Sequence, residues 1–171
     1  MVKKFGSKSP NVWSNYAHFL HVTRADPTRA RALLPRAMQQ LPKMHHQNII
    51  SRFAALEFRS PNGNPEQGRT MFEGLLAAFP KKGDLWSQLL DLEGDDETAV
   101  RDVFERRTRV KGLKPKQAES WFRRWAAWEE KRDPKGKEKV MAKANAWVVA
   151  HKAKKAAAEA AAAEEDEEME D

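Results

Sequence analysis

Large apolar residues recur along the chain three positions apart, and four such groups follow one another at a nearly constant interval. The groups begin at Trp13, Ile50, Trp86 and Phe122, which lie 37, 36 and 36 residues apart. Residues three or four positions apart share one face of an α-helix, so each group predicts a helix with one apolar face. The constant interval predicts a repeat protein. The full groups are Trp13, Tyr16 and Phe19; Ile50, Phe53, Leu56 and Glu57; Trp86, Leu89, Leu92 and Glu93; and Phe122, Trp125, Trp128 and Glu129.

A second pattern, in which smaller apolar residues surround an arginine, lies between these groups. It occupies residues 30–34, 68–73 and 100–106 and predicts a second helix in each repeat. Pro42 and Pro80 follow two of these helices, and proline marks their ends because it cannot continue a helix. The fourth copy is degenerate, as expected for a terminal repeat. It keeps an apolar stripe of Val140, Ala144, Trp147, Val148 and His151.

No segment alternates apolar and polar residues with a period of two, so the predicted fold is all-α. One helix pair cannot bury its apolar face alone, which favours an α-solenoid of about four stacked pairs over residues 11–151. Residues 1–10 are expected to be the end of a preceding repeat and a linker, with residues 1–5 helical and Gly6 as a stop. Residues 152–171 form a tail. Its Ala-rich part is expected to extend the last helix, and its acidic end, residues 164–171, is expected to be disordered.

The charge is distributed unevenly. The formal net charge is +6, but residues 152–171 carry three lysines and eight acids, so the rest of the chain has a net charge of +11. This excess suits an anionic partner such as nucleic acid, or serves only solubility. The acidic tail is open to three interpretations: it binds a basic partner, it competes for the basic surface, or it keeps the terminus soluble.

Several classes of chemistry lack the residues that they need. The chain has no cysteine, which excludes disulfides, thiolate nucleophiles and cysteine-ligated zinc. His18 with His21, and His45 with His46, do not match a zinc site. The sequence has no phosphate-binding glycine loop and no nucleophile set. No apolar run is long enough to cross a membrane, and the first residues lack the apolar run that is typical of a signal peptide. We therefore expect no catalytic residue, cofactor, metal, small-molecule substrate or membrane partner.

The two helix patterns together resemble the HAT (half-a-TPR) repeat. The resemblance is carried by Trp13, Tyr16 and Phe19 in one helix and by Arg101, Phe104, Glu105 and Arg106 in the other. The related tetratricopeptide repeat has a 34-residue period and small residues where this chain has aromatics. HAT repeats occur in RNA-processing proteins, and the resemblance implies a right-handed solenoid that acts as a non-catalytic scaffold.

A closer resemblance covers roughly residues 1–150. Residues 1–5, 33–42, 53–58, 68–76, 80–86 and 103–106 are similar to the C-terminal HAT repeats of large eukaryotic ribosomal-RNA-processing factors with tandem oligonucleotide-binding-fold domains. It implies a nuclear, nucleolar role in precursor-rRNA cleavage and small-subunit assembly. The implied partners are ribosome-assembly proteins, with precursor rRNA or small nucleolar RNA. The alternative is a HAT module of another RNA-processing complex, in mRNA splicing or 3′-end processing.

The densest basic stretch is the candidate RNA site, because a stripe of cations neutralises phosphates. The alternative is that these residues form only a solvated face of the repeats. The candidate residues are Arg106, Arg107, Arg109, Lys111, Lys114, Lys116, Arg123 and Arg124.

Other recurring residues are predicted to be structural. Glu57, Glu93 and Glu129 recur at one position, as do Arg31, Arg69 and Arg101, and a catalytic carboxylate has no reason to recur in every repeat. We expect these acids and arginines to pair between helices. The predicted structural positions are Trp13, Tyr16, Phe53, Glu57, Arg69, Phe72, Trp86, Glu93, Arg101, Phe104, Trp125, Trp128 and Glu129.

Overall fold

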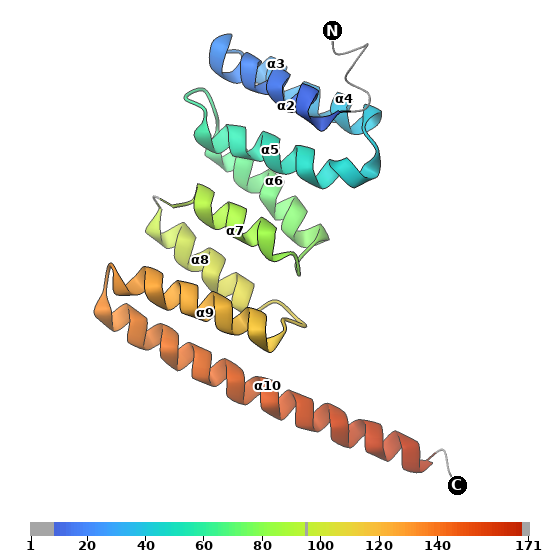
Figure 1. Cartoon of the computed structure of the whole chain (residues 1–171), viewed down its shortest axis with the longest axis vertical. Coiled ribbons are helices and arrows are strands. Elements are labelled where there is room, and N and C mark those ends of the chain that lie inside the picture. Colours follow the sequence, from blue (N-terminus) through green and yellow to red (C-terminus); the bar gives the residue numbers. More distant parts are fainter. Residues whose placement is uncertain (1–8, 95, 169–171) are drawn as a thin grey trace. The chain divides into compact units, whose positions relative to one another are not determined.

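The computed structural model describes residues 9–94 and 96–168, apart from the side chains of residues 134 and 162–168. All elements within this part of the chain are helices, which confirms the all-α prediction (Figure 1). The chain divides into two compact units between Val103 and Phe104. The helix expected at residues 1–5, the stop at Gly6 and the last three acidic-tail residues lie outside the described residues. The right-handed sense of the solenoid stays a prediction.

The first unit contains three pairs of helical segments. The first pair is α2 (Pro10–His18), which continues into a π-helical turn (Phe19–Thr23), with α3 (Pro27–Arg31) and α4 (Leu33–Gln40). A short 3-10 turn (Lys43–His45) leads to the second pair, α5 (His46–Arg59) and α6 (Pro65–Ala78). The third pair begins with α7 (Gly83–Leu92) and α8 (Glu97–Thr108), whose last residues belong to the second unit.

Local sequence explains where several helices begin. The side chains of Asp26 and Asn64 accept hydrogen bonds from backbone N–H groups of the first turns of α3 and α6, at 2.9 and 3.0 Å. A proline follows each of these caps at the first helical position, where its missing N–H costs no hydrogen bond.

The first repeat differs from the prediction, because its second helix is two helices that divide at Ala32. Pro35 supplies the physical reason. It cannot donate to the carbonyl of Arg31, four residues earlier, and its ring crowds that carbonyl. Pro35 is instead the third residue of α4, within the first turn, where a missing N–H is tolerated.

The helices of the first unit stack in sequence. Helix α5 packs against α2 and α4, and α7 packs against α5 and α6. Phe53, Phe72 and Trp86 are buried between these layers. The indole N–H of Trp86 donates to the carbonyl of Pro80 at 2.9 Å, which satisfies the polar atom of an otherwise apolar side chain.

Two arginine–glutamate pairs join neighbouring layers of this unit. Arg31 donates two hydrogen bonds of 2.8 Å to Glu57, and Arg69 donates two of 2.6 Å to Glu93. In each pair the glutamate is the buried partner. A pairing of Arg101 with Glu129 would span the two units and stays a prediction.

The second unit consists of the end of α8, α9 (Pro115–Glu130) and α10 (Pro134–Glu168). Phe104 is fully buried, and its ring lies parallel to the Trp125 ring at 5.6 Å and edge-on to the Trp121 ring at 6.0 Å. Helix α10 continues through the Ala-rich segment to Glu168. The helix includes residues 164–168, and the disorder expected for the acidic end of the tail stays a prediction.

The predicted structural positions are mostly buried in their own unit. Tyr16, Arg69, Arg101 and Trp128 are partly exposed. Arg101 forms an ion pair with Glu97 one turn away, and Glu129 accepts a hydrogen bond from Trp125. The buried positions are Trp13, Phe53, Glu57, Phe72, Trp86, Glu93, Phe104, Trp125 and Glu129.

Candidate functional site

The second unit carries the two surfaces that we consider as functional sites. One is the set of basic side chains between α8 and the middle of α9. The other is a groove of about 650 Å³ between α9 and α10, which we call the α9/α10 groove. Its lining residues are Pro115, Lys116, Glu119, Phe122, Arg123, Ala126, Ala127, Glu130, Lys137, Met141, Ala144, Asn145, Trp147 and Val148.

Helix α9 is apolar on two faces, which explains how it lines a groove while packing in a core. Trp121 and Trp125 contact Phe104, whereas Phe122 and Ala126 line the α9/α10 groove. Successive residues of an α-helix are rotated by about 100°, so these two sets face different directions.

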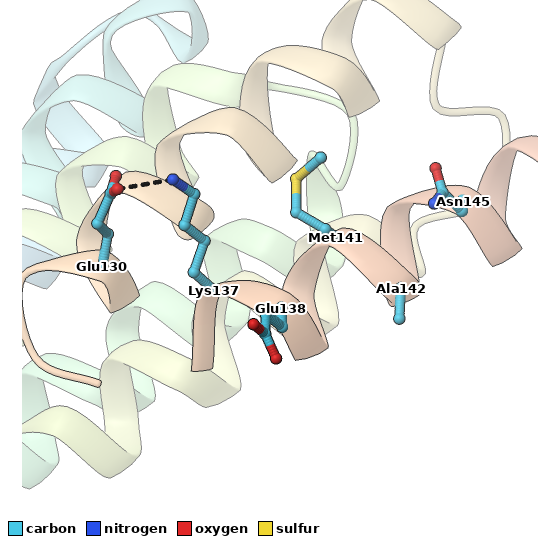
Figure 2. A pocket seen from close by; sticks show the side chains of 6 residues that line it. All are labelled: Glu130, Lys137, Glu138, Met141, Ala142 and Asn145. Atoms are coloured by element: carbon cyan, nitrogen blue, oxygen red, sulfur yellow. Dashed lines mark hydrogen bonds and ion pairs between the residues drawn. The ribbon is translucent and has the colours of Figure 1, made fainter. Parts of the chain in front are cut away.

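The α10 wall of the groove combines a charged rim with exposed apolar side chains. Lys137 forms an ion pair of 2.6 Å with Glu130 of α9, and Figure 2 shows Met141 one turn farther along α10. Met141 is 48% exposed and Val148 is 45% exposed. Ala142 lines a neighbouring hollow of about 700 Å³. Glu130, Lys137 and Met141 line both this hollow and the groove.

The predicted basic residues do not form one continuous stripe. Arg106 and Arg107 lie in the last turn of α8, Arg109 and Lys111 lie in the following loop, and Lys114 is the N-cap of α9. Farther along α9, Lys116 and Arg123 are two turns apart, and both line the α9/α10 groove. Arg124 turns to another face, where its guanidinium lies 5.6 Å from the centre of the Trp121 ring.

Arg107 requires a correction. Its side chain is 1% exposed, so it is a core residue and cannot contact RNA from the surface. Its guanidinium lies 5.8 Å from the centre of the Trp121 ring, and burial lowers its pKa. The sequence places Arg107 among other basic residues, and only its position on the inner face of α8 separates it from them.

The remaining basic residues reach solvent to different degrees. Arg106 is partly exposed, and Arg109, Lys111, Lys114, Lys116, Arg123 and Arg124 are exposed. Two of them are held by acids one turn away, Arg109 by Glu105 and Arg123 by Glu119, each at 2.6 Å. Such exposed pairs are weak, so both guanidinium groups remain available to a phosphate.

Lys143 of α10 adds a cation that is not among the candidate residues named from the sequence. Its ammonium donates to Glu105 at 2.7 Å and lies 4.9 Å from the centre of the Trp125 ring. This hydrogen bond holds the pKa of Glu105 below its ordinary value, despite the opposing effect of burial. Lys143 closes the basic stretch that begins at Arg101, but its contact with Glu105, 38 residues earlier, has no signal in the sequence.

Two of the histidines, His21 and His46, make structural contacts. His21 is buried with its Nε2 3.4 Å from Glu57, and His46 donates from Nε2 to the carbonyl of Leu41 at 2.9 Å. Within the described parts of the chain, no group of three or more histidines and acids is arranged to hold a metal ion. None of the described helices combines the length and apolarity that a membrane span requires.

Comparison with known proteins identifies relatives of the whole repeat region. No family model matches the chain. The rRNA biogenesis protein rrp5 of Schizosaccharomyces pombe is 43% identical over 151 residues, which is 86% of this chain. Protein RRP5 homolog of Mus musculus is 34% identical over 153 residues, or 88% of the chain. The rRNA biogenesis protein RRP5 of Arabidopsis thaliana is 33% identical over 133 residues, or 76% of the chain.

These relatives are much longer than the chain, which spans 9%, 8% and 7% of their lengths, respectively. The match confirms the resemblance to large ribosomal-RNA-processing factors, and it favours that interpretation over splicing or 3′-end processing. By sequence, the chain belongs to the RRP5 rRNA biogenesis proteins and matches a fragment of their length.

Proposed function

We propose that this chain is a non-catalytic helical scaffold in rRNA biogenesis that binds ribosome-assembly proteins and contacts precursor rRNA through the basic surface of its second unit. The observation that carries the proposal is the identity of 43% over 86% of the chain to a protein named for rRNA biogenesis. A nuclear, nucleolar location follows from that role, because precursor rRNA is made and first processed there.

The helical architecture supports the scaffold part of the proposal. Stacked helix pairs expose long, regular surfaces to which partners can bind. The acids that recur between repeats, Glu57 and Glu93, are held by Arg31 and Arg69. They are therefore engaged in packing the repeats together.

The exposed cations support the RNA part of the proposal. Arg109, Lys111 and Lys114 occupy one loop of six residues and extend into solvent. Neutralising phosphates with such groups releases counterions, so affinity falls as salt rises. The aromatic rings nearby are packed in the core, so the expected contact is with the RNA backbone and carries little sequence preference.

The test is an anisotropy titration of labelled single-stranded RNA with the full chain at several salt concentrations. The test variant is Arg109→Gln, Lys111→Gln, Lys114→Gln. The matched control is Lys152→Gln, Lys154→Gln, Lys155→Gln, which removes the same charge from the exposed continuation of α10. We expect the test variant to bind more weakly and to lose about 2 from the slope of log affinity against log salt, at about 0.7 for each lost phosphate contact.

Equal losses in the two variants would mean that only net charge matters and would reject the loop as an RNA surface. Absence of binding by the wild type at moderate salt would also reject RNA contact. In that case the scaffold would act through proteins alone.

A further inference from the structure

We propose that the α9/α10 groove binds an acidic amphipathic helix of a partner protein, with large apolar side chains three and four residues apart. The inference rests on the proposed scaffold function and specifies where the scaffold holds a protein and what kind of segment it takes.

The first argument is that, in the first unit, a helix of the chain covers the surface that corresponds to this groove. There, each pair of helices is covered by the first helix of the next pair: α5 packs against α2 and α4, and α7 packs against α5 and α6. The α9/α10 groove is the surface that such a third helix would cover. Its walls are the last two helices of the second unit, and its floor includes Phe122 and Ala126.

The second argument is the apolar surface left on the groove. Met141 and Val148 are 48% and 45% exposed, although they lie two turns apart on one face of α10. From Lys137 to Val148 the α10 wall is roughly 16 Å long at 1.5 Å per residue, which is the length of about three helical turns. An amphipathic helix of that length buries these side chains in the usual helix-in-groove manner.

The third argument is the charge of the rim. Three cations, Lys116, Arg123 and Lys137, border the groove, against two acids. Both acids are already engaged, Glu119 by Arg123 and Glu130 by Lys137. The same two pairs engage Arg123 and Lys137, so the rim keeps a net charge of +1, with Lys116 as the cation outside these pairs. A positive rim favours acidic residues beside the apolar face of the bound helix.

Helix α7 has this chemistry and provides a probe. It carries Leu85, Trp86, Leu89 and Leu90 as its buried face, and Asp84 and Asp91 lie on the same helix. A labelled peptide of residues 82–94, with blocked termini, therefore represents the expected class of partner. The same peptide with Trp86→Ala and Leu89→Ala lacks its two central apolar anchors.

The experiment is a fluorescence titration of the full chain with the residue 82–94 peptide. The test variant is Val148→Glu, which places an acid in the groove, and the matched control is Val149→Glu, which adds the same charge one residue farther on. Val149 is 67% exposed and does not line the groove. We expect the wild type and Val149→Glu to bind alike, Val148→Glu to bind at least about tenfold more weakly, and the double-alanine peptide not to bind.

A second variant, Ala127→Glu, changes the opposite wall of the groove and is expected to weaken binding as Val148→Glu does. Circular dichroism melts of all variants identify any that fail to fold. No binding of the peptide to the wild type, or equal weakening by Val148→Glu and Val149→Glu, would overturn the proposal. So would a concentration-dependent dimer that Val148→Glu abolishes, because a second copy would then fill the groove. The RNA titration is expected to be unchanged by Val148→Glu, so the two proposals fail separately.

Discussion

The guanidinium group of Arg69 holds the buried carboxylate of Glu93 through two parallel hydrogen bonds, from Nε to Oε1 and from Nη2 to Oε2, each 2.6 Å long. Arg31 and Glu57 repeat this geometry one layer earlier. Paired forks of this kind fix the distance and direction between helices, because both partners are planar. The recurrence at equivalent positions identifies the pair as a structural element of the repeat.

We expect Arg69→Ala to lower the stability of the protein by about 2–4 kcal/mol, because it leaves the buried carboxylate of Glu93 without its guanidinium partner. The measurement is a thermal or urea melt. Arg123→Ala is the matched control, since it breaks an exposed pair with Glu119 and is expected to cost less than about 1 kcal/mol. Equal effects of the two substitutions would show that the Arg69 pair has no special structural role.

Substitution by alanine is expected to have opposite effects on stability at two glycines of α6. A Cβ on Gly68 would lie 2.6 Å from the Phe58 ring and 3.0 Å from the carbonyl of Ala54. Gly68→Ala should therefore force α5 and α6 apart and destabilise the protein by roughly 1–3 kcal/mol. A Cβ on Gly74 meets nothing within 4 Å, so Gly74→Ala should stabilise it by about 0.5–1 kcal/mol, through higher helix propensity. Urea melts compare the two, and a stabilising Gly68→Ala would contradict the close helix packing.

Buried His21 makes stability depend on pH. Burial lowers its pKa below the ordinary value of 6.5, outweighing the attraction of Glu57. Between the folded pKa and 6.5 the unfolded chain binds more protons, so stability rises with pH and is lost as pH falls below about 6.5. We expect His21→Gln to flatten this part of the curve, whose slope is at most about 1.4 kcal/mol per pH unit. Melts at pH 5 to 7.5 test it, and an unchanged slope would show that His21 does not titrate there.

The buried carboxylate of Glu57 makes the stability of the protein depend on pH in a lower pH range. Burial alone would raise its pKa, but the hydrogen bonds from Arg31 and from the backbone N–H of Asn64, with the charge of Arg31, hold the pKa below its ordinary value. Its stabilising effect is therefore complete above the pKa that it has in the unfolded chain and is lost as pH falls through the lower folded value. We therefore expect the His21→Gln variant still to lose stability in melts at lower pH, where the carboxylate of Glu57 becomes protonated.

The repeat architecture was predictable because its signal is physical and periodic. Large apolar residues such as Phe53 and Trp86 must face a core, and their spacing shows which face of the helix does so. The division at Ala32 was also within reach, since Pro35 forbids a continuous helix there. The π-helical turn at Phe19–Thr23 had no such signal, because it is set by how α2 meets the following segments.

The candidate site was less predictable from the sequence, because the exposure of a side chain depends on which other helices pack against its own helix. Arg107 and Arg109 look alike in the sequence, yet one is buried and the other reaches solvent. Met141 lies in a segment rich in lysine and alanine, where an apolar side chain at the surface gives no periodic signal. Only the pairing of α9 with α10 brings it opposite Phe122 and Ala126 and forms the groove.

Helix α10 is 35 residues long and α9 is 16, so one is a rod of about 52 Å and the other of about 24 Å. The indole of Trp147 is tied to the carbonyl of Thr108. The fourteen residues from there to Ala161 extend about 21 Å farther at 1.5 Å per residue. A tilt of about 10° at Trp147 thus displaces Ala161 by roughly 4 Å over that length. A small change in the angle between α10 and α9 at the groove therefore produces a larger displacement at the far end of α10.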